Sequence, residues 1–234
     1  MQPYYSDELV TLFHGDCRDV MAAMAPASVD AVVTDPPYSA FTHGNAVTNK
    51  GSGGAHRAID FDSMTEEECR VAMAECGRVS RGWVVTTLEW RHAAAFDANP
   101  PLGLRMLRVG VWVKNNPTPQ ISGDRPAQGW EAIAYMHRAD VKPTWTGGGR
   151  HGNFITNVEQ GTGHPTVKPL RMIRQFIEWF VPPVGTVFDP FAGSGTTLRA
   201  AMDAGRRAIG VELREDYCES IVRRLAQGTL FGAA

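Results

Sequence analysis

The sequence predicts an α/β fold in which helices cover both faces of a doubly wound, mainly parallel sheet. Two observations predict it. Strand-like and helix-like segments alternate along most of the 234 residues, as in parallel sheets. In addition, two apolar strands run directly into Asp-Pro-Pro-Tyr at 35–38 and into a glycine-rich turn at 191–197. With 43% hydrophobic residues and a net charge of −2, residues 1–234 fit a single globular domain.

The first third of the chain predicts one β-α-β unit followed by a long loop. Residues 9–14 and 29–34 are apolar strands, and a helix follows Asp16 between them. Residues 39–60 are rich in Gly, Ser, Asn and Thr and exceed an ordinary connection, so we expect a functional lid or a disordered segment. Residues 65–77 predict a helix with acids in its first turn and Gly77 at its end.

The middle and the last third continue the alternation. We expect strands at 81–89, 104–114 and 130–138, a helix at 90–98, a loop at 115–129 and an irregular stretch at 139–167. An amphipathic helix at 169–181 begins with proline. Strands at 186–190 and 206–213 then alternate with helices at 197–205 and 214–226, and no segment repeats another.

The cysteines and the hydropathy pattern exclude several classes of protein. Cys17, Cys69, Cys76 and Cys218 form no CxxC pair and no zinc-like cluster, so we expect no metal. Cys69 and Cys76 lie seven residues apart in a predicted helix, which fits two buried thiols better than a disulfide. The N-terminal residues show no basic and apolar leader, and no apolar run reaches the roughly 18 residues of a membrane helix. These patterns favour a soluble, cytoplasmic protein.

The glycine-rich segment FDPFAGSGTT at 188–197 predicts a small-molecule site. Gly193 and Gly195 allow the backbone to approach a ligand at the carboxyl edge of the sheet. Position 198 is leucine, where a dinucleotide fingerprint requires glycine or alanine. Glu212 ends the next strand, so its carboxylate should face the same crevice and suits the hydroxyls of a ribose. The pattern therefore indicates an adenosine-containing ligand without identifying it.

Three motifs together resemble the amino-group DNA methyltransferases that use S-adenosylmethionine. DPPY at 35–38 matches the catalytic motif of that family, FDPFAGSGTT its cofactor loop, and HPTVKP at 164–169 the segment before that loop. The order, with the catalytic motif first, resembles the circularly permuted β-type, in which residues 15–17 hold the GDC position near the adenine of the cofactor. The resemblance implies a Rossmann-like methyltransferase fold, and it covers the middle of the chain only weakly.

The resemblance also implies roles for individual residues. The Asp35 carboxylate and the Pro36 carbonyl would accept hydrogen bonds from the target amine, Tyr38 would stack on the base, and Pro36 and Pro37 would stiffen this catalytic segment. The implied cofactor site comprises Asp16, Cys17, Asp35, His164, Pro165, Thr166, Lys168, Asp189, Phe191, Ala192, Gly193, Ser194, Gly195, Thr196, Thr197 and Glu212.

The implied partner is double-stranded DNA, from which the target base is flipped. Residues 101–150 contain seven Lys or Arg against three Asp or Glu, so we expect a small target-recognition region at 101–163. Candidate DNA contacts are Lys50, Arg57, Lys114, Asn115, Gln120, Arg125 and Trp130, with His56, Asn116, Gln128 and the GTGH run at 161–164 beside them.

Within the family, DPPY favours the N6 amine of adenine, and the N4 amine of cytosine is the alternative. The permuted order and HPTVKP argue against methylation of RNA or glutamine. A nucleotide-dependent oxidoreductase would have no use for DPPY, and a DNA-binding protein without catalysis would not need both motifs intact. The chain lacks the distinct recognition domain of larger relatives, so pairing with a second copy would help to enclose DNA, and homodimers occur in the family.

Overall fold

The computed structural model describes residues 1–39, 63–117, 119–120, 123–159 and 167–227. In this part of the chain one sheet has the strand order β1-β2-β9-β8-β3-β4-β6-β5-β7. Its strands are β1 (Tyr5–Ser6), β2 (Val10–His14), β3 (Val29–Thr34), β4 (Ser80–Leu88), β5 (Leu104–Lys114), β6 (Trp130–Arg138), β7 (Asn153–Thr156), β8 (Thr186–Asp189) and β9 (Arg207–Glu212). Five of the eight neighbouring pairs are parallel, which confirms the predicted mainly parallel sheet.

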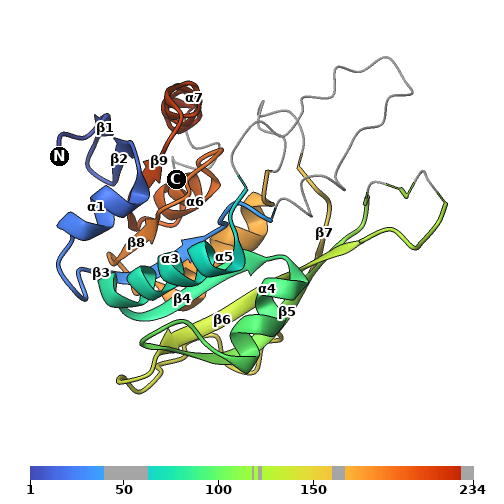
Figure 1. Ribbon diagram of the computed structural model, residues 1–234. Coiled ribbons are helices and arrows are strands. Elements are labelled where there is room, and N and C mark those ends of the chain that lie inside the picture. Colours follow the sequence, from blue (N-terminus) through green and yellow to red (C-terminus); the bar gives the residue numbers. More distant parts are fainter. Residues whose placement is uncertain (40–62, 118, 121–122, 160–166, 228–234) are drawn as a thin grey trace, which may run out of the picture.

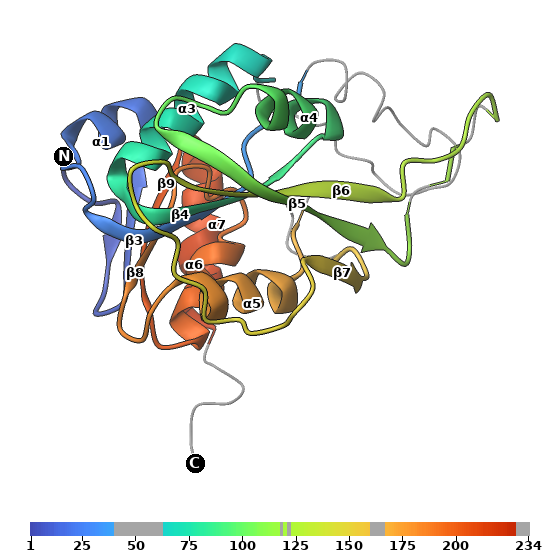
Figure 2. The ribbon, with the colours of Figure 1, turned by 90° about the horizontal axis from the view of Figure 1, so that it is seen from below.

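Helices cover both faces of the sheet, as predicted (Figures 1 and 2). One face is covered by α1 (Cys17–Ala23), α3 (Glu66–Val79) and α4 (Trp90–Ala98). The other face is covered by α5 (Leu170–Phe180), α6 (Thr196–Asp203) and α7 (Glu215–Ala226). Each helix buries its apolar side against the strands, so two hydrophobic cores lie on opposite sides of the sheet.

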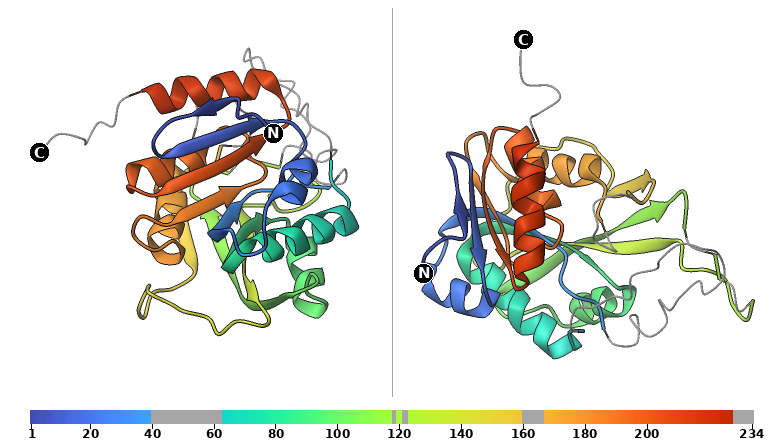
Figure 3. Two further views of the ribbon diagram at one scale, coloured as in Figure 1. Left: turned by 90° about the vertical axis from the view of Figure 1, so that its left-hand side faces the viewer. Right: turned by 90° about the horizontal axis from the view of Figure 1, so that it is seen from above.

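The sheet brings together segments that are far apart in the sequence. β8 and β9 come late in the chain, yet they lie between β2 and β3 (Figure 3). From β8 the chain winds through α6 to β9, whereas from β3 it winds through α3 to β4 on the other side. The direction of winding therefore changes between β8 and β3, and such a switch point opens a ligand crevice at the carboxyl ends of the strands.

The start of α3 follows its sequence signal, but its end does not. Thr65 and Glu68 form a reciprocal capping box at the start of the helix. The helix continues past Gly77 to Val79, so the prediction that Gly77 ends it was wrong. A Cβ added at Gly77 would lie 2.8 Å from Leu104 Cδ2, so this glycine allows close packing of α3 against β5.

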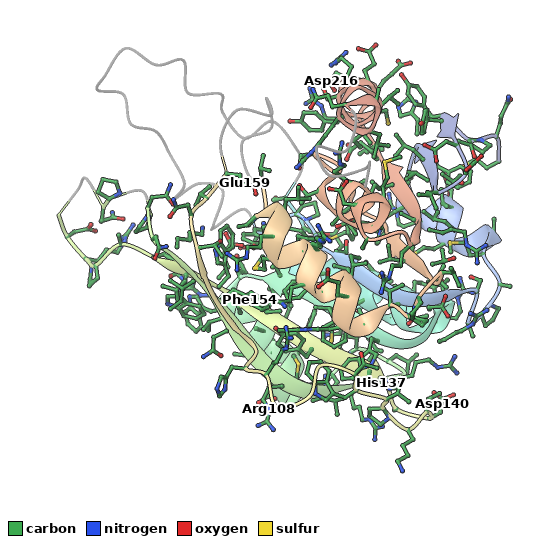
Figure 4. The ribbon with its side chains drawn as sticks, turned by 180° about the vertical axis from the view of Figure 1, so that it is seen from behind. Arg108, His137, Asp140, Phe154, Glu159 and Asp216 are labelled. Atoms are coloured by element: carbon green, nitrogen blue, oxygen red, sulfur yellow. The ribbon has the colours of Figure 1, made fainter. Side chains whose placement is uncertain are left out.

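The helix α5 begins at the predicted proline, and an acidic side chain from another segment supports its first turn. Glu159 lies beside the N-terminal end of α5 (Figure 4). Its Oε1 accepts a hydrogen bond of 2.7 Å from the backbone N–H of Leu170. This contact satisfies a donor that the helix leaves free and places a negative charge at the positive end of the helix dipole.

The sequence patterns did not predict two short strands. β1 pairs antiparallel with β2 at one edge of the sheet, and β7 pairs parallel with β5 at the other edge. Residues 101–163 include β5, β6 and β7 of the central sheet. Contact between DNA and the loops of this region stays a prediction. Cys69 and Cys76 are buried and free, as expected, and so are Cys17 and Cys218. No described helix is long and apolar enough to span a membrane.

Candidate active site

The carboxyl ends of β3 and β8 meet at the switch point. The Thr34 hydroxyl, at the end of β3, donates a buried hydrogen bond of 2.7 Å to Asp189 Oδ1, at the end of β8. The same oxygen accepts from the backbone N–H of Phe191 at 3.1 Å. This contact joins the segment before DPPY to the first residues of the glycine loop, which the sequence separates by more than 150 positions.

Asp35, the acid of DPPY, is held from two sides. Thr87 on β4 donates to Asp35 Oδ1 at 2.5 Å, and the Lys168 ammonium donates to Oδ2 in a short ion pair. The Asp35 side chain keeps 26% of its surface exposed, so it is not fully enclosed by these partners. Ser39, just after DPPY, donates to Glu89 Oε2 at 2.8 Å. The DPPY segment is therefore attached to the sheet by its acid and by the residue that follows it.

Glu131, near the start of β6, lies at the centre of this group. Its Oε2 accepts from the Tyr38 hydroxyl at 2.6 Å and lies 3.4 Å from Lys168 Nζ, while its Oε1 pairs with Lys114 Nζ at 2.7 Å. Sequence reasoning missed Glu131 and Thr87. The signal for Glu131 was a lone carboxylate in the strand sequence WEAIAYMHR, directly before the mainly apolar run AIAYM. A buried charge needs partners, and such a position marks a site candidate.

Burial and the two ammonium groups shift the pKa values of Asp35 and Glu131 in opposite directions. Burial raises the pKa of Asp35, opposed by Lys168 and reinforced by the negative charge of Glu131. Burial also opposes ionisation of Glu131, but Lys168 and Lys114 outweigh it and lower the pKa of Glu131 to about 2. Burial disfavours the charge of Lys168, yet its two carboxylate partners raise its pKa. Lys168 is thus a cation shared by two acids.

The glycine loop has a backbone geometry that favours glycine at two positions. Gly193 and Gly195 have φ of 51° and 74°, in the left-handed region that favours glycine, and Gly195 caps the start of α6. The Gly193 N–H donates to Glu212 Oε2 at 2.8 Å, and the Arg214 N–H donates to Oε1 at 2.9 Å. Glu212 therefore lies beside the loop, as expected, and burial raises its pKa.

The segment Gly15-Asp16-Cys17 borders the same edge of the sheet. The Gly15 N–H donates to the backbone carbonyl of Glu212 at 2.9 Å. Asp16 caps α1 through the Arg18 N–H and also pairs with the Arg18 guanidinium. Cys17 is buried in the core, and its burial raises the pKa of the thiol to about 11. The thiol is therefore protonated near neutral pH and acts as a small apolar group.

The other residues of the predicted cofactor site divide into three groups. Asp189 is buried, and burial raises its pKa to about 6. Phe191, Ala192 and the residues 194–197 form the glycine loop and the first turn of α6. Lys168 is ion-paired with Asp35 and Glu131. His164, Pro165 and Thr166 lie outside the described residues.

The residues predicted to contact DNA differ in their exposure and in their partners. Lys114 is turned toward Glu131, with 21% of its side chain exposed. Trp130, beside it on β6, is 37% exposed, and Arg125 is exposed and pairs with Asp124. The Asn115 N–H donates to Thr156, and Gln120 donates to Asp124. Lys50, His56 and Arg57 lie outside the described residues, as does the GTGH run at 161–164.

Comparison with known proteins decides the family. The model of a DNA methylase family, covering the N6 and N4 enzymes, matches residues 140–223. The Escherichia coli (strain K12) protein named "Putative methylase YubD" is 33% identical over 222 residues, which cover 91% of this chain and 88% of that protein. The chain belongs to the N6/N4 DNA methylase family. The Type II methyltransferase M2.LlaDCHI of Lactococcus lactis subsp. cremoris is 26% identical to this methylase over 99% of the chain and 94% of the relative.

A solved structure extends the similarity to three dimensions. It is the complex with S-adenosyl-L-methionine of a Thermus thermophilus protein named "Putative DNA Modification Methylase", which is 25% identical to this methylase. The TM-score is 0.66, with 92% of this chain and 93% of that chain covered. The Rossmann-like fold predicted from the motifs is therefore confirmed. Among the described residues, no cluster of His, Cys, Asp or Glu could hold a metal ion.

Proposed function

We propose that this methylase transfers a methyl group from S-adenosylmethionine to the exocyclic N6 amine of an adenine flipped out of double-stranded DNA. One observation supports it above the others. The Thr34–Asp189 hydrogen bond of 2.7 Å brings the DPPY segment and the glycine loop to the same crevice. A methyl donor bound at the loop and an amine bound at Asp35 would then be neighbours, as direct transfer requires.

The residues around the glycine loop fit the proposed cofactor. Glu212 uses each carboxylate oxygen for one backbone N–H, and each oxygen keeps a second lone pair that a ribose hydroxyl can use. Asp16, Cys17, Asp189 and the loop residues would line the rest of this site. When bound, the cofactor supplies an electrophilic methyl group on a sulfonium. The task of the chain is to orient that group and to keep water away from it.

The DPPY segment would prepare the amine for attack. The nitrogen lone pair of the amine is delocalised into the ring, and acceptors on its two N–H groups favour a pyramidal nitrogen with a free lone pair. The Asp35 carboxylate and the Pro36 carbonyl would be these acceptors, and Tyr38 would stack on the base. Because the prolines and Thr87 hold the acceptors in place, little reorganisation accompanies the developing positive charge on nitrogen.

DNA would approach the carboxyl edge of the sheet, where the site opens. Extruding the base costs roughly a few kcal/mol of unstacking, which contacts to the backbone must offset. We propose that the loops within residues 101–163 supply these contacts, with Arg125 and Trp130 as exposed candidates. Pairing with a second copy would enlarge this surface, and sedimentation analysis with and without duplex DNA would detect such a homodimer. The proposed setting of the reaction is DNA in the cytoplasm.

The test uses DNA and S-adenosylmethionine labelled in its methyl group. The methylase is incubated with a mixture of unmethylated duplexes, the DNA is digested to nucleosides, and the labelled nucleoside is identified. Label in N6-methyl-2′-deoxyadenosine supports the proposal, and label in N4-methyl-2′-deoxycytidine establishes the alternative within the family. Retained cofactor binding without label in any DNA would contradict the proposed activity.

A further inference from the structure

The Lys168 ammonium lies between two carboxylates and is bonded mainly to one of them. It donates to Asp35 Oδ2 in a short ion pair, and it lies 3.4 Å from Glu131 Oε2. A second cation, Lys114, holds the other oxygen of Glu131 at 2.7 Å. The side chains of Lys168 and Glu131 are only 8% and 13% exposed. The structure thus contains a buried cation that is ion-paired with both carboxylates and lies closer to Asp35 than to Glu131.

The present pairing opposes the proposed reaction. Methyl transfer places positive charge on the target nitrogen, which Asp35 is proposed to stabilise. An ammonium bonded to Asp35 weakens this carboxylate as an acceptor, and it repels the developing positive charge. Both effects strengthen when the base and the cofactor exclude water from the site. Lys168 on Asp35 therefore suits the enzyme before the base enters and hinders the enzyme during transfer.

We propose that Glu131 is a positioning residue that takes the Lys168 ammonium from Asp35 when the target base enters the site. This inference rests on the proposed function. Glu131 is suited to the role because Lys114 keeps it ionised and because Tyr38 donates to the same oxygen at 2.6 Å. Stacking of the base on Tyr38 would thereby be linked to the position of the cation. The two carboxylates and two ammonium groups balance, so the exchange changes no net charge.

A double-mutant cycle tests the exchange. Single-turnover methyl transfer is measured for the wild type, Glu131→Gln, Lys168→Met and the double variant, on a duplex that the wild type methylates. We expect E131Q to slow transfer by about tenfold or more with cofactor affinity unchanged. In the Lys168→Met background the same substitution should change the rate by less than about twofold, because the ammonium that is bonded to Asp35 is then absent. The matched control is Asp30→Asn, which removes an ion-paired carboxylate near the other end of β3 and should leave transfer unchanged.

The outcomes separate the two proposals. A wild type that methylates no DNA would contradict the proposed function itself. An active wild type in which E131Q causes equal losses in both backgrounds would overturn only the exchange, since Glu131 would then act without Lys168. If E131Q does not fold, a crystal structure of the wild type bound to S-adenosylhomocysteine and the substrate duplex tests the inference instead. Lys168 bonded to Glu131 and detached from Asp35 supports the inference, whereas Lys168 still bonded to Asp35 overturns it.

Discussion

Replacing Asp189 by asparagine should change how the stability of the methylase depends on pH. Asp189 is buried at the end of β8, and burial raises its pKa from 3.8 to about 6. Between these two values the folded chain binds a proton more tightly than the unfolded chain does. This carboxyl therefore contributes most to stability below pH 4, and its contribution falls as the pH rises toward 6.

The size of the effect follows from the difference between the two pKa values. A difference of about two units, at about 1.4 kcal/mol for each, corresponds to roughly 3 kcal/mol of unfolding free energy. Asparagine has the same shape, and its amide oxygen can accept from Thr34 and from the Phe191 N–H as Oδ1 does now. Because asparagine does not titrate, the D189N variant should gain roughly 3 kcal/mol relative to the wild type between pH 4 and pH 7.

Urea unfolding of both proteins at several pH values between 4 and 7 measures this difference, provided that the transition is two-state. The matched control is Asp97→Asn, which changes an exposed aspartate on α4 and should leave a curve parallel to that of the wild type. Parallel curves for D189N and the wild type would refute the reasoning, because Asp189 would then titrate alike in the folded and unfolded chains.

Four further variants, one of them a control, test the site and the fold separately. Asp35→Ala should abolish methyl transfer and leave cofactor affinity, measured by calorimetry, largely intact; loss of cofactor binding would show that the role of Asp35 is misassigned. Gly195→Ala should lose about 1–3 kcal/mol of stability and bind cofactor more weakly, because φ is +74° and the new Cβ would lie 2.9 Å from Ile221. Gly205→Ala is the control for backbone strain alone, since φ at Gly205 is +65° but no atom lies within 4 Å of the added Cβ. Equal losses of stability in the two glycine variants would show that the contact with Ile221 contributes nothing. Thr65→Ala should cost about 1 kcal/mol in thermal or urea unfolding through its capping box without changing transfer, and an unchanged stability would mean that the cap contributes nothing.

The local elements of the fold could be predicted because their signals lie within short windows. Short apolar runs marked the strands from β2 to β9 except β7, and helical patterns marked the helices. Gly77 shows the limit of such windows. A glycine near the end of a helical pattern usually marks its C-terminus, but this one remains helical because Leu104, from a distant strand, needs its space. No window around residue 77 contains that information.

Part of the candidate site could likewise be predicted from the sequence, and part could not. The motifs placed Asp35 and Glu212 at strand ends, and in parallel strands the carboxyl ends share one edge of the sheet. The partners of Asp35 could not be predicted, because Thr87 and Glu131 reach the site through the pairing of β4 with β3 and β6. Lys168 reaches it from the segment before α5, far away in the sequence. By itself the sequence determined the fold class and the two motifs at the crevice. Only the tertiary structure decided which charges share Lys168, since ion pairing depends on distances in space that the chain order does not contain.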